Sequence, residues 1–199
     1  MTRNTIDSRI LARYTRGNEC EAFNISDLAR LTKAAYPHVH AAVQQLVDEG
    51  VLVKRRFGRS DYCTVNLDSP LARALLDAAL HRANEQFYRQ PNIANLQREL
   101  SLLSTKEPRL LGALHTKDGI LLLLTERAAV KSILKKTSLT HLSFSTPTEL
   151  RLDARDRRGC FDGTTPLFGY ERLLVELASI QEALVLNHAN AFRSGGERR

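Results

Sequence analysis

The chain has 199 residues, 43% of them hydrophobic, and carries a net charge of +7 with an isoelectric point of about 9.6. This composition supports a packed core and excludes wholesale disorder, while the basic balance favours an acidic partner, nucleic acid before an anionic membrane. The longest apolar run, residues 120–124, is far too short to cross a bilayer, and the first residues lack a signal peptide's apolar run, so we expect a cytoplasmic protein.

The first 25 residues predict a helix and a short strand. The apolar residues of the helix recur at the spacing of one face: Ile6, Ile10, Leu11 and Tyr14. The helix is expected to end at residues 17–18. Residues 22–25 predict a strand that pairs with a hairpin later in the chain and protects one of its edges.

Two further helices are predicted in close succession. Ser26 is expected to be the N-cap of the first helix, which presents Leu28 and Leu31 on one face. Residues 33–36 then form a tight connection. Pro37 falls in the first turn of the second helix, and Gly50 ends it. The apolar residues of this second helix share one face: Val39, Val43, Leu46 and Val47.

A basic hairpin follows over residues 51–65. Residues 51–53 begin a strand, residues 54–56 are all basic, residues 58–60 form the turn, and residues 62–65 return. Two helices at a tight angle followed by a basic hairpin, the wing, are the plan of a winged helix-turn-helix.

The chain then continues with helices. Asp68 or Ser69 can cap a helix that has Pro70 at its first position and runs to about Tyr88. Its apolar face is formed by Leu71, Leu75, Leu76, Ala79 and Leu80. Residues 90–92 are expected to form a boundary, and residues 93–103 a further helix.

The last ninety residues predict a mixture of strands and helices. Two apolar runs, residues 110–114 and 120–124, are joined by Asp118-Gly119, which predicts a hairpin. The other expected segments are a helix over 125–135 with Ala128, Ala129, Ile133 and Leu134 inward, a strand over 139–145, a helix start at Thr146, a solvated charged segment over 153–158, a loop over 163–169 and a last helix over about 171–192.

Recognition of duplex DNA by a winged domain requires side chains at base edges and cations at phosphates. The residues expected to face outward around the second helix are Lys33, Tyr36, Pro37, His38, His40, Ala41 and Gln44, and the cations of the wing are Lys54, Arg55, Arg56 and Arg59. Gln44 can pair with adenine, and Ala41 leaves room for a thymine methyl group. Strand alternation places Lys54 and Arg56 on one side of the wing and Arg55 on the other.

The residues predict no enzyme active site, cofactor or metal. P-loop, G-x-G-x-x-G, H-E-x-x-H and G-x-S-x-G motifs are all absent. The three cysteines, Cys20, Cys63 and Cys160, are far apart and favour reduced thiols. A thiol–imidazole pair of Cys160 with His141 or His188 is the alternative.

Residues 32–65 resemble the winged-helix regulators of the MarR/ArsR kind. The resemblance rests on the segments Tyr36–His40, Leu46–Leu52 and Arg59–Tyr62, and it covers about the first 80 residues. Residues 65–72 also resemble a junction in archaeal proteins that join such a domain to a nucleotidyltransferase-like domain. The Gly-Ser turn and paired Asp-x-Asp of that family are missing near residues 111–124, so this resemblance implies a fold without an active site.

We therefore predict an α+β protein with an N-terminal winged helix-turn-helix (residues 1–68), a helical linker used for dimerisation (69–104) and a C-terminal α/β domain (105–193), degenerate nucleotidyltransferase-like. The expected function is sequence-specific binding of double-stranded DNA as a transcriptional regulator. We expect a homodimer, because one winged domain reads only half of a palindromic site. The alternatives are a DNA-binding role in plasmid or chromosome partition or replication, a nucleotidyltransferase-related enzyme or antitoxin-type partner, and a winged domain used only for protein contacts.

Overall fold

The computed structural model describes residues 5–15, 18–57, 60–149, 164–179 and 181. The elements of the first part are α1 (Thr5–Leu11), the 3-10 turn η1 (Ala12–Tyr14), β1 (Phe23–Asn24), α2 (Ile25–Thr32), α3 (Tyr36–Asp48), β2 (Leu52–Phe57) and β3 (Ser60–Val65). The later elements are α4 (Pro70–Ala83), α5 (Glu85–Tyr88), α6 (Pro91–Lys106), β4 (Leu110–Thr116), β5 (Gly119–Leu124), α7 (Ala129–Lys136), β6 (Leu142–Ser145) and β7 (Thr165–Phe168). A last helix begins at residue 170, and its described part covers residues 170–179 and 181.

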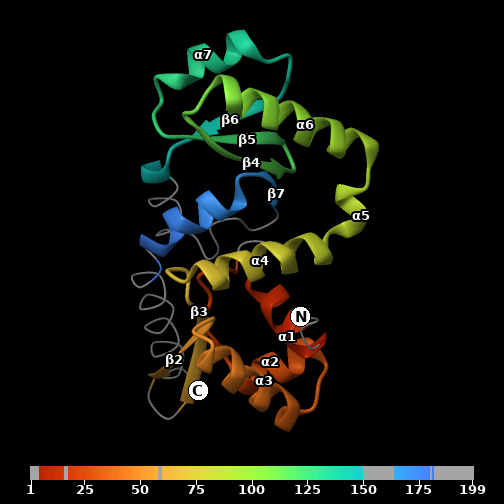
Figure 1. Ribbon diagram of the computed structural model, residues 1–199, viewed down its shortest axis with the longest axis vertical. Helices are drawn as coiled ribbons and strands as arrows, with labels where there is room; N and C mark the ends of the chain where they lie inside the picture. The colour runs from red at the N-terminus through yellow and green to blue at the C-terminus, as the bar shows by residue number, and fades with distance from the viewer. Residues whose placement is uncertain (1–4, 16–17, 58–59, 150–163, 180, 182–199) are drawn as a thin grey trace, which may run out of the picture.

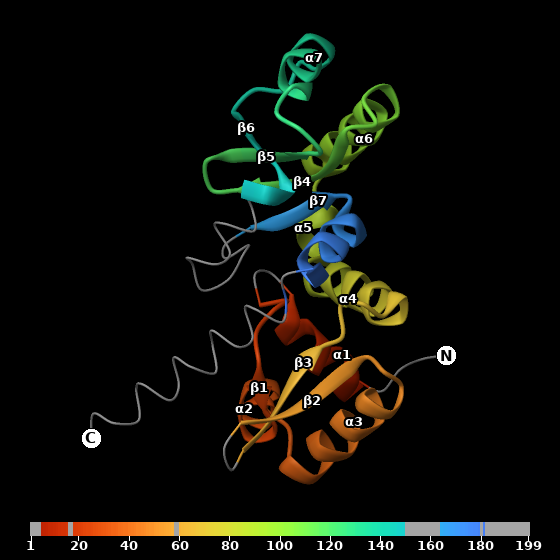
Figure 2. The ribbon, with the colours of Figure 1, turned by 90° about the vertical axis from the view of Figure 1, so that its left-hand side faces the viewer.

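The molecule is elongated, and its elements form layers along the long axis (Figure 1). Helices α6 and α7 lie at one end, followed by the sheet that contains β4 and β5, then by α4 and the last helix, and finally by α1, α2, α3 and the hairpin of β2 and β3. Figure 2 shows the same order from the side. Within the described part of the chain, every helix falls short of the length or apolar character that crossing a bilayer requires.

The first part of the chain is a winged helix-turn-helix. Its strands form an antiparallel sheet in the order β1-β3-β2, and Phe23 pairs with Cys63 while Leu52 pairs with Val65. The short strand β1 therefore pairs with the wing as predicted. Helices α1, α2 and α3 pack against each other over a core in which Ile10, Leu28 and Leu46 are fully buried.

The helix boundaries differ slightly from those expected. The N-cap of α2 is Asn24, whose side chain accepts a hydrogen bond from the Asp27 amide at 2.7 Å, so the prediction of Ser26 was wrong by two residues. Asn is as good an N-cap as Ser, and β1 ends at this point. Helix α3 begins at Tyr36 with Pro37 in its first turn, and Gly50 follows its end with φ +69°. Both ends of α3 thus agree with the prediction to within one residue.

Helix α4 is shorter than predicted, because a break at Asn84 separates it from α5. The Ser69 side chain caps α4 by accepting from the Ala72 amide at 3.4 Å, and Pro70 is the first residue, as expected. At the other end, Asn84 Nδ2 donates to the Leu80 carbonyl oxygen at 2.8 Å. An Asn side chain competes with the backbone for hydrogen bonds in this way, which disfavours it inside a helix. The predicted inward position of Leu71 was also wrong, since this side chain is 46% exposed.

The second sheet has the strand order β6-β5-β4-β7. Strands β4 and β5 form the predicted hairpin, and Gly119 at its turn has φ +140°. The connection through α7 returns the chain as β6, which lies parallel to β5. Strand β7 pairs antiparallel with β4, whereas a loop was expected there. The sequence Thr165–Phe168 is short and contains Pro166, which is unusual within a sheet but tolerated in an edge strand such as β7.

The two faces of this sheet pack on different layers. Leu110, Leu122 and Leu124 pack with Leu100 of α6 and Ile133 of α7 on one face. The other face contributes Leu114 and Leu123 to a continuous core that also contains the last helix, α4 and the winged helices. Successive side chains of β5 therefore point alternately into two hydrophobic cores, one on each face of the sheet.

Helix α7 starts later than predicted. It begins at Ala129 instead of residue 125, and Leu134, which was expected to point inward, is 54% exposed. The predicted helix start at Thr146 is confirmed, because its amide donates to Glu149 Oε2 at 2.8 Å and its hydroxyl accepts from the Glu149 amide at 3.4 Å. This is a capping box. The charged segment 153–158 lies outside the described residues.

A buried carboxylate ties α6, β4 and α7 together. The Glu107 side chain is 2% exposed and accepts hydrogen bonds from Arg109 at 3.0 Å, Ser132 at 2.6 Å and Lys136 at 3.0 Å. These donors hold the pKa of Glu107 well below its ordinary value, with the Arg109 hydrogen bond as the largest cause. The surrounding donors compensate the buried charge on several sides, so removal of either the carboxylate or a cation would leave the other charge uncompensated.

The last helix attaches the second sheet to the winged part. Tyr170 at its start donates to buried Glu19 at 2.8 Å, and burial raises the pKa of the Tyr170 phenol well above its usual range. Near its other described end, Gln181 Nε2 donates to the Val65 carbonyl oxygen at 2.6 Å, and its carbonyl accepts from the Leu67 amide at 3.4 Å. The base of the wing is thus bonded directly to the last helix.

Replacing Gly169 with Ala is expected to destabilise the protein by about 2–4 kcal/mol. Gly169 has φ +71°, and an added Cβ would lie 2.2 Å from the Leu111 carbonyl oxygen and 2.8 Å from the Gly112 Cα. Gly50→Ala is the matched control, because Gly50 has φ +69° with nothing within 4 Å of the new atom. Gly50→Ala should destabilise the protein by only about 1 kcal/mol, because the left-handed backbone conformation is then the only source of strain. Equal losses in urea unfolding would show that the close approach of β4 to Gly169 does not matter.

Candidate nucleic-acid interface

The side of α3 that the sequence predicts to face outward is exposed. Val39, Ala42, Val43 and Leu46 are buried on its inner side. The outward residues predicted from the sequence are all exposed: Tyr36, Pro37, His38, His40, Ala41 and Gln44. Helix α3, which lies at one end of the molecule (Figure 1), therefore presents polar and small side chains on its outer side.

Two side-chain contacts order this face. The rings of Tyr36 and His40 lie 6.0 Å apart, one helical turn from each other. Gln44 Nε2 donates to Asp48 Oδ1 at 2.9 Å. If Gln44 were to read adenine, this bond within the helix would have to be exchanged for one with the base.

Lys33 lies in the turn that joins α2 to α3. Its backbone has φ +51°, and its amide donates to carbonyl oxygens of the last turn of α2. A left-handed residue at this position satisfies orphan carbonyl groups and directs the chain into the next helix. The Lys33 side chain is exposed just before α3, as predicted.

The wing has two different faces. Lys54 and Arg56 lie on the same face as Leu52, Cys63 and Val65, which belong to the core, so these cations extend that face beyond the helices. Arg55 is half-buried on the opposite face, where it pairs across the strands with Tyr62. This arrangement agrees with the predicted alternation.

Lys54 is not a free cation, which the sequence prediction missed. Its Nζ lies 2.9 Å from Asp61 Oδ2, and this hydrogen bond is the main cause that raises the pKa of Lys54 and lowers the pKa of Asp61. The register of the hairpin explains this contact: Arg56 pairs with Asp61, and Lys54 lies one position farther along the same face. Arg56 itself is exposed. Arg59, the remaining predicted cation, lies outside the described residues.

Both thiols of the described residues, Cys20 and Cys63, are buried, and burial raises the pKa of the Cys63 thiol to about 11. A thiol that stays protonated at neutral pH is a poor nucleophile. Cys160 and His188 of the alternative thiol–imidazole pair lie outside the described residues, while His141 is exposed.

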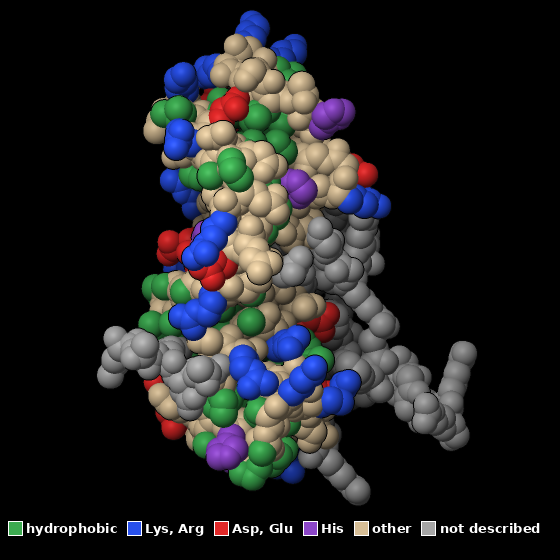
Figure 3. Space-filling view, turned by 90° about the vertical axis from the view of Figure 1, so that its right-hand side faces the viewer, with side chains coloured by type: hydrophobic (Ala, Val, Ile, Leu, Met, Phe, Trp, Pro, Cys, Tyr) green, Lys and Arg blue, Asp and Glu red, His purple; other side chains and the backbone are tan. Residues whose placement is uncertain are grey.

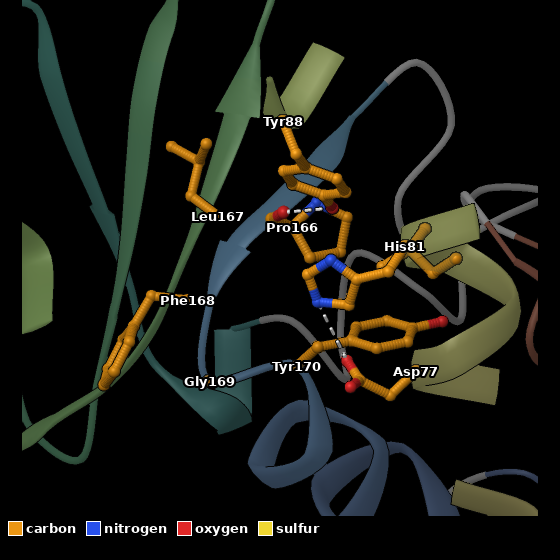
Figure 4. Close-up of a pocket in the computed structure, with 9 residues that line it drawn as sticks. Asp77, His81, Tyr88, Pro166, Leu167, Phe168, Gly169 and Tyr170 are labelled. Atoms are coloured by element: carbon orange, nitrogen blue, oxygen red, sulfur yellow. Dashed lines mark hydrogen bonds and ion pairs between the residues drawn. The ribbon is translucent and has the colours of Figure 1, made fainter. Parts of the chain in front are cut away.

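A small polar pocket of about 60 Å³ lies between α4, α5, β7 and the last helix (Figure 4). His81 lies 3.6 Å from Asp77 and packs on Tyr88 with 4.6 Å between ring centroids. The Tyr88 hydroxyl donates to the Pro166 carbonyl oxygen at 2.7 Å. Burial raises the pKa of Asp77, Glu171 adds to this increase, and His81 opposes it. The space equals only about two water molecules, so this is a polar junction between elements and no effector site is assigned to it.

No protein-family model and no curated protein matches this chain. Three solved structures show a partial likeness. The adhesin competence repressor AdcR from Streptococcus pyogenes has 21% identity and a TM-score of 0.37, with 54% of this chain and 72% of that chain covered. The transcriptional regulator BldR from Sulfolobus solfataricus has 21% identity and a TM-score of 0.35, with 53% and 76% covered. A MarR-family transcriptional regulator from Rhodococcus sp. RHA1 has 18% identity and a TM-score of 0.35, with the same shares covered. All three TM-scores are below 0.5, so these likenesses do not indicate a function for this chain.

Proposed function

We propose that this chain binds double-stranded DNA with sequence preference, through α3 in the major groove and the wing on the adjoining backbone, and that it acts as a transcriptional regulator. The observation that carries the proposal is the uncovered outer face of α3, where six predicted contact residues are exposed together. An α-helix fits the major groove of B-DNA, and His, Gln and Tyr side chains can bond base edges there.

The cations around α3 supply the phosphate contacts in this proposal. Lys33 lies immediately before the helix, and Lys54 and Arg56 are exposed on one face of the wing. The wing packs against α3 through β2. Phosphate contacts on both sides of a helix fix its position in the groove while the helix reads the bases.

A homodimer is part of the proposal. One winged domain reads half a site, and a two-fold dimer matches a palindrome, with half-sites about one helical turn apart. The proposal assigns no reaction to the chain. A nucleotidyl-transfer site uses paired carboxylates. The hairpin of β4 and β5, whose residues the structure describes in full, carries one acidic side chain, Asp118, which is exposed at the turn.

Selection of bound fragments from a random duplex pool, followed by affinity measurements over a salt series, tests this function. Arg56→Ala is expected to lower the slope of log K against log salt by about 0.9, the value for one phosphate contact. Lys54→Ala should change it less, because Asp61 already neutralises Lys54. Lys117→Ala is the control: this exposed cation lies at the turn between β4 and β5, and its replacement should leave the slope unchanged.

Recovery of a palindromic sequence and a protected region of one site would support a regulator. Protection that spreads over several repeats would favour partition or replication instead. Absence of any enriched sequence, together with salt-independent affinity, would contradict DNA binding altogether.

A further inference from the structure

Arginine side chains on α1 and on the 3-10 turn that follows it continue the basic surface beyond the turn that precedes α3. Arg9 lies on α1 and Arg13 in η1, and both are exposed. Arg13 also donates to the carbonyl oxygen of Leu31, which is two residues before Lys33. Arg13 is therefore adjacent to the helix-turn-helix turn.

The surface extends from α1 onto α4. Arg82 of α4 donates to the Ser8 hydroxyl at 2.8 Å, so its guanidinium lies beside α1. Ser8 immediately precedes Arg9 in the sequence. Contacts thus connect the turn, α1 and α4, and we name Arg9, Arg13 and Arg82 the flank stripe. Figure 3 views the molecule from the side of α1 and shows Lys and Arg side chains gathered there in its lower half.

The acidic side chain on the neighbouring helix α2 is engaged elsewhere, because Asp27 pairs with Arg30 at 3.1 Å. Among the described residues, Arg9, Arg13 and Arg82 form no ion pair with a carboxylate. Three exposed guanidinium groups without acidic partners suit a polyanion, since guanidinium geometry matches phosphate oxygens.

We infer that the flank stripe binds the phosphate backbone of duplex DNA outside the segment that α3 reads. This inference rests on the proposed function, and it adds a second contact surface on the side of the winged part. A duplex bent toward α1 would reach this surface, and additional phosphate contacts can offset the free energy of bending.

Two duplexes with the same selected core test the inference, one limited to about 15 base pairs and one extended to about 35 base pairs by arbitrary flanks. The wild-type protein is expected to show a steeper salt dependence on the long duplex. The variant Arg9→Ala/Arg13→Ala should lower the slope by about 2 and weaken binding roughly tenfold on the long duplex only. Arg9→Ala alone should lower it by about 1, and it leaves the Arg13 bond to α2 in place.

The matched control is Lys131→Ala/Lys135→Ala. These two residues are also exposed and four apart in the sequence, but they belong to α7, which lies at the opposite end of the molecule (Figure 1), so both slopes should be unchanged. Thermal unfolding of each variant checks that the fold is intact.

Three results would overturn the inference. If Arg9→Ala leaves the salt slope on the long duplex unchanged, Arg9 does not contact the flanking DNA. If it lowers the slope equally on both duplexes, Arg9 contacts the core site instead. If the double variant binds poly-glutamate more weakly than the wild-type protein does, while its salt slope on DNA is unchanged, the flank stripe binds an acidic protein. If the wild-type protein binds neither duplex, the proposed function itself fails, and that result is distinct from the other three.

Discussion

Replacing Ala41 with glutamate is expected to weaken duplex binding by about 100-fold or more. Ala41 is exposed in the middle of the outer face of α3, between His40 and Gln44, so a carboxylate there would enter the groove beside base acceptors and phosphates. The fold should tolerate the change, because Glu is a good helix former and the position contacts no core residue. Fluorescence anisotropy with a selected duplex measures the effect.

Ala94→Glu is the control for this prediction. Ala94 is also an exposed alanine within a helix, but it lies on α6, in the layer at the far end of the molecule (Figure 1). The control changes net charge and helix composition equally and should leave affinity within about twofold. A similar loss for both variants would mean that only total charge matters. Unchanged binding by Ala41→Glu would exclude α3 from the interface.

Replacing Glu107 with Gln is expected to lower the midpoint of thermal unfolding by roughly 5 °C or more. The substitution keeps the shape of the side chain but removes the charge that Arg109, Ser132 and Lys136 surround. Two cations would then face a neutral amide whose nitrogen is a donor. Differential scanning calorimetry at neutral pH measures the loss.

The same carboxylate predicts how stability depends on pH. Its pKa in the folded protein lies well below the ordinary value of 4.5, so the stabilisation is complete above about pH 4.5 and is lost as the pH falls toward the folded pKa. The wild-type protein should therefore lose stability over that acidic range more steeply than Glu107→Gln does.

Glu126→Gln provides the comparison for both measurements. Glu126 also bonds Arg109, at 3.3 Å, but its side chain is 55% exposed. Its replacement should change the unfolding midpoint by less than about 2 °C, because exposed ion pairs contribute little. Equal effects of the two substitutions would contradict a special role for the buried carboxylate.

The winged part was predictable because several local signals agree there. Apolar residues at helical spacing, Pro37 in a first turn, Gly50 after a helix end and a basic hairpin all favour one arrangement. The six outward residues of α3 follow from the same spacing, and the structure finds all of them exposed. Their contact with DNA stays a prediction.

The remaining elements depend on contacts that periodicity does not contain. Strand β7 forms because Thr165–Phe168 pairs with β4, fifty residues earlier in the chain, and four residues with a proline carry little strand signal. The break at Asn84 depends on one side-chain hydrogen bond. The pairing of Lys54 with Asp61 required the register of the hairpin. The domain boundaries at residues 68 and 104, the nucleotidyltransferase-like relationship and the homodimer all stay predictions.

The bond between Tyr170 and Glu19 has a practical consequence for fragments of this protein. Expression of the first eighty or hundred residues alone would leave the Glu19 carboxylate without its phenol donor and would uncover the side chains on which Leu173, Leu174 and Leu177 rest. Such a truncated fragment would expose apolar side chains, so it would tend to aggregate and would be poorly suited to crystallisation or NMR. Recombinant fragments of the N-terminal region should therefore retain the last helix, if necessary joined to it through a designed linker.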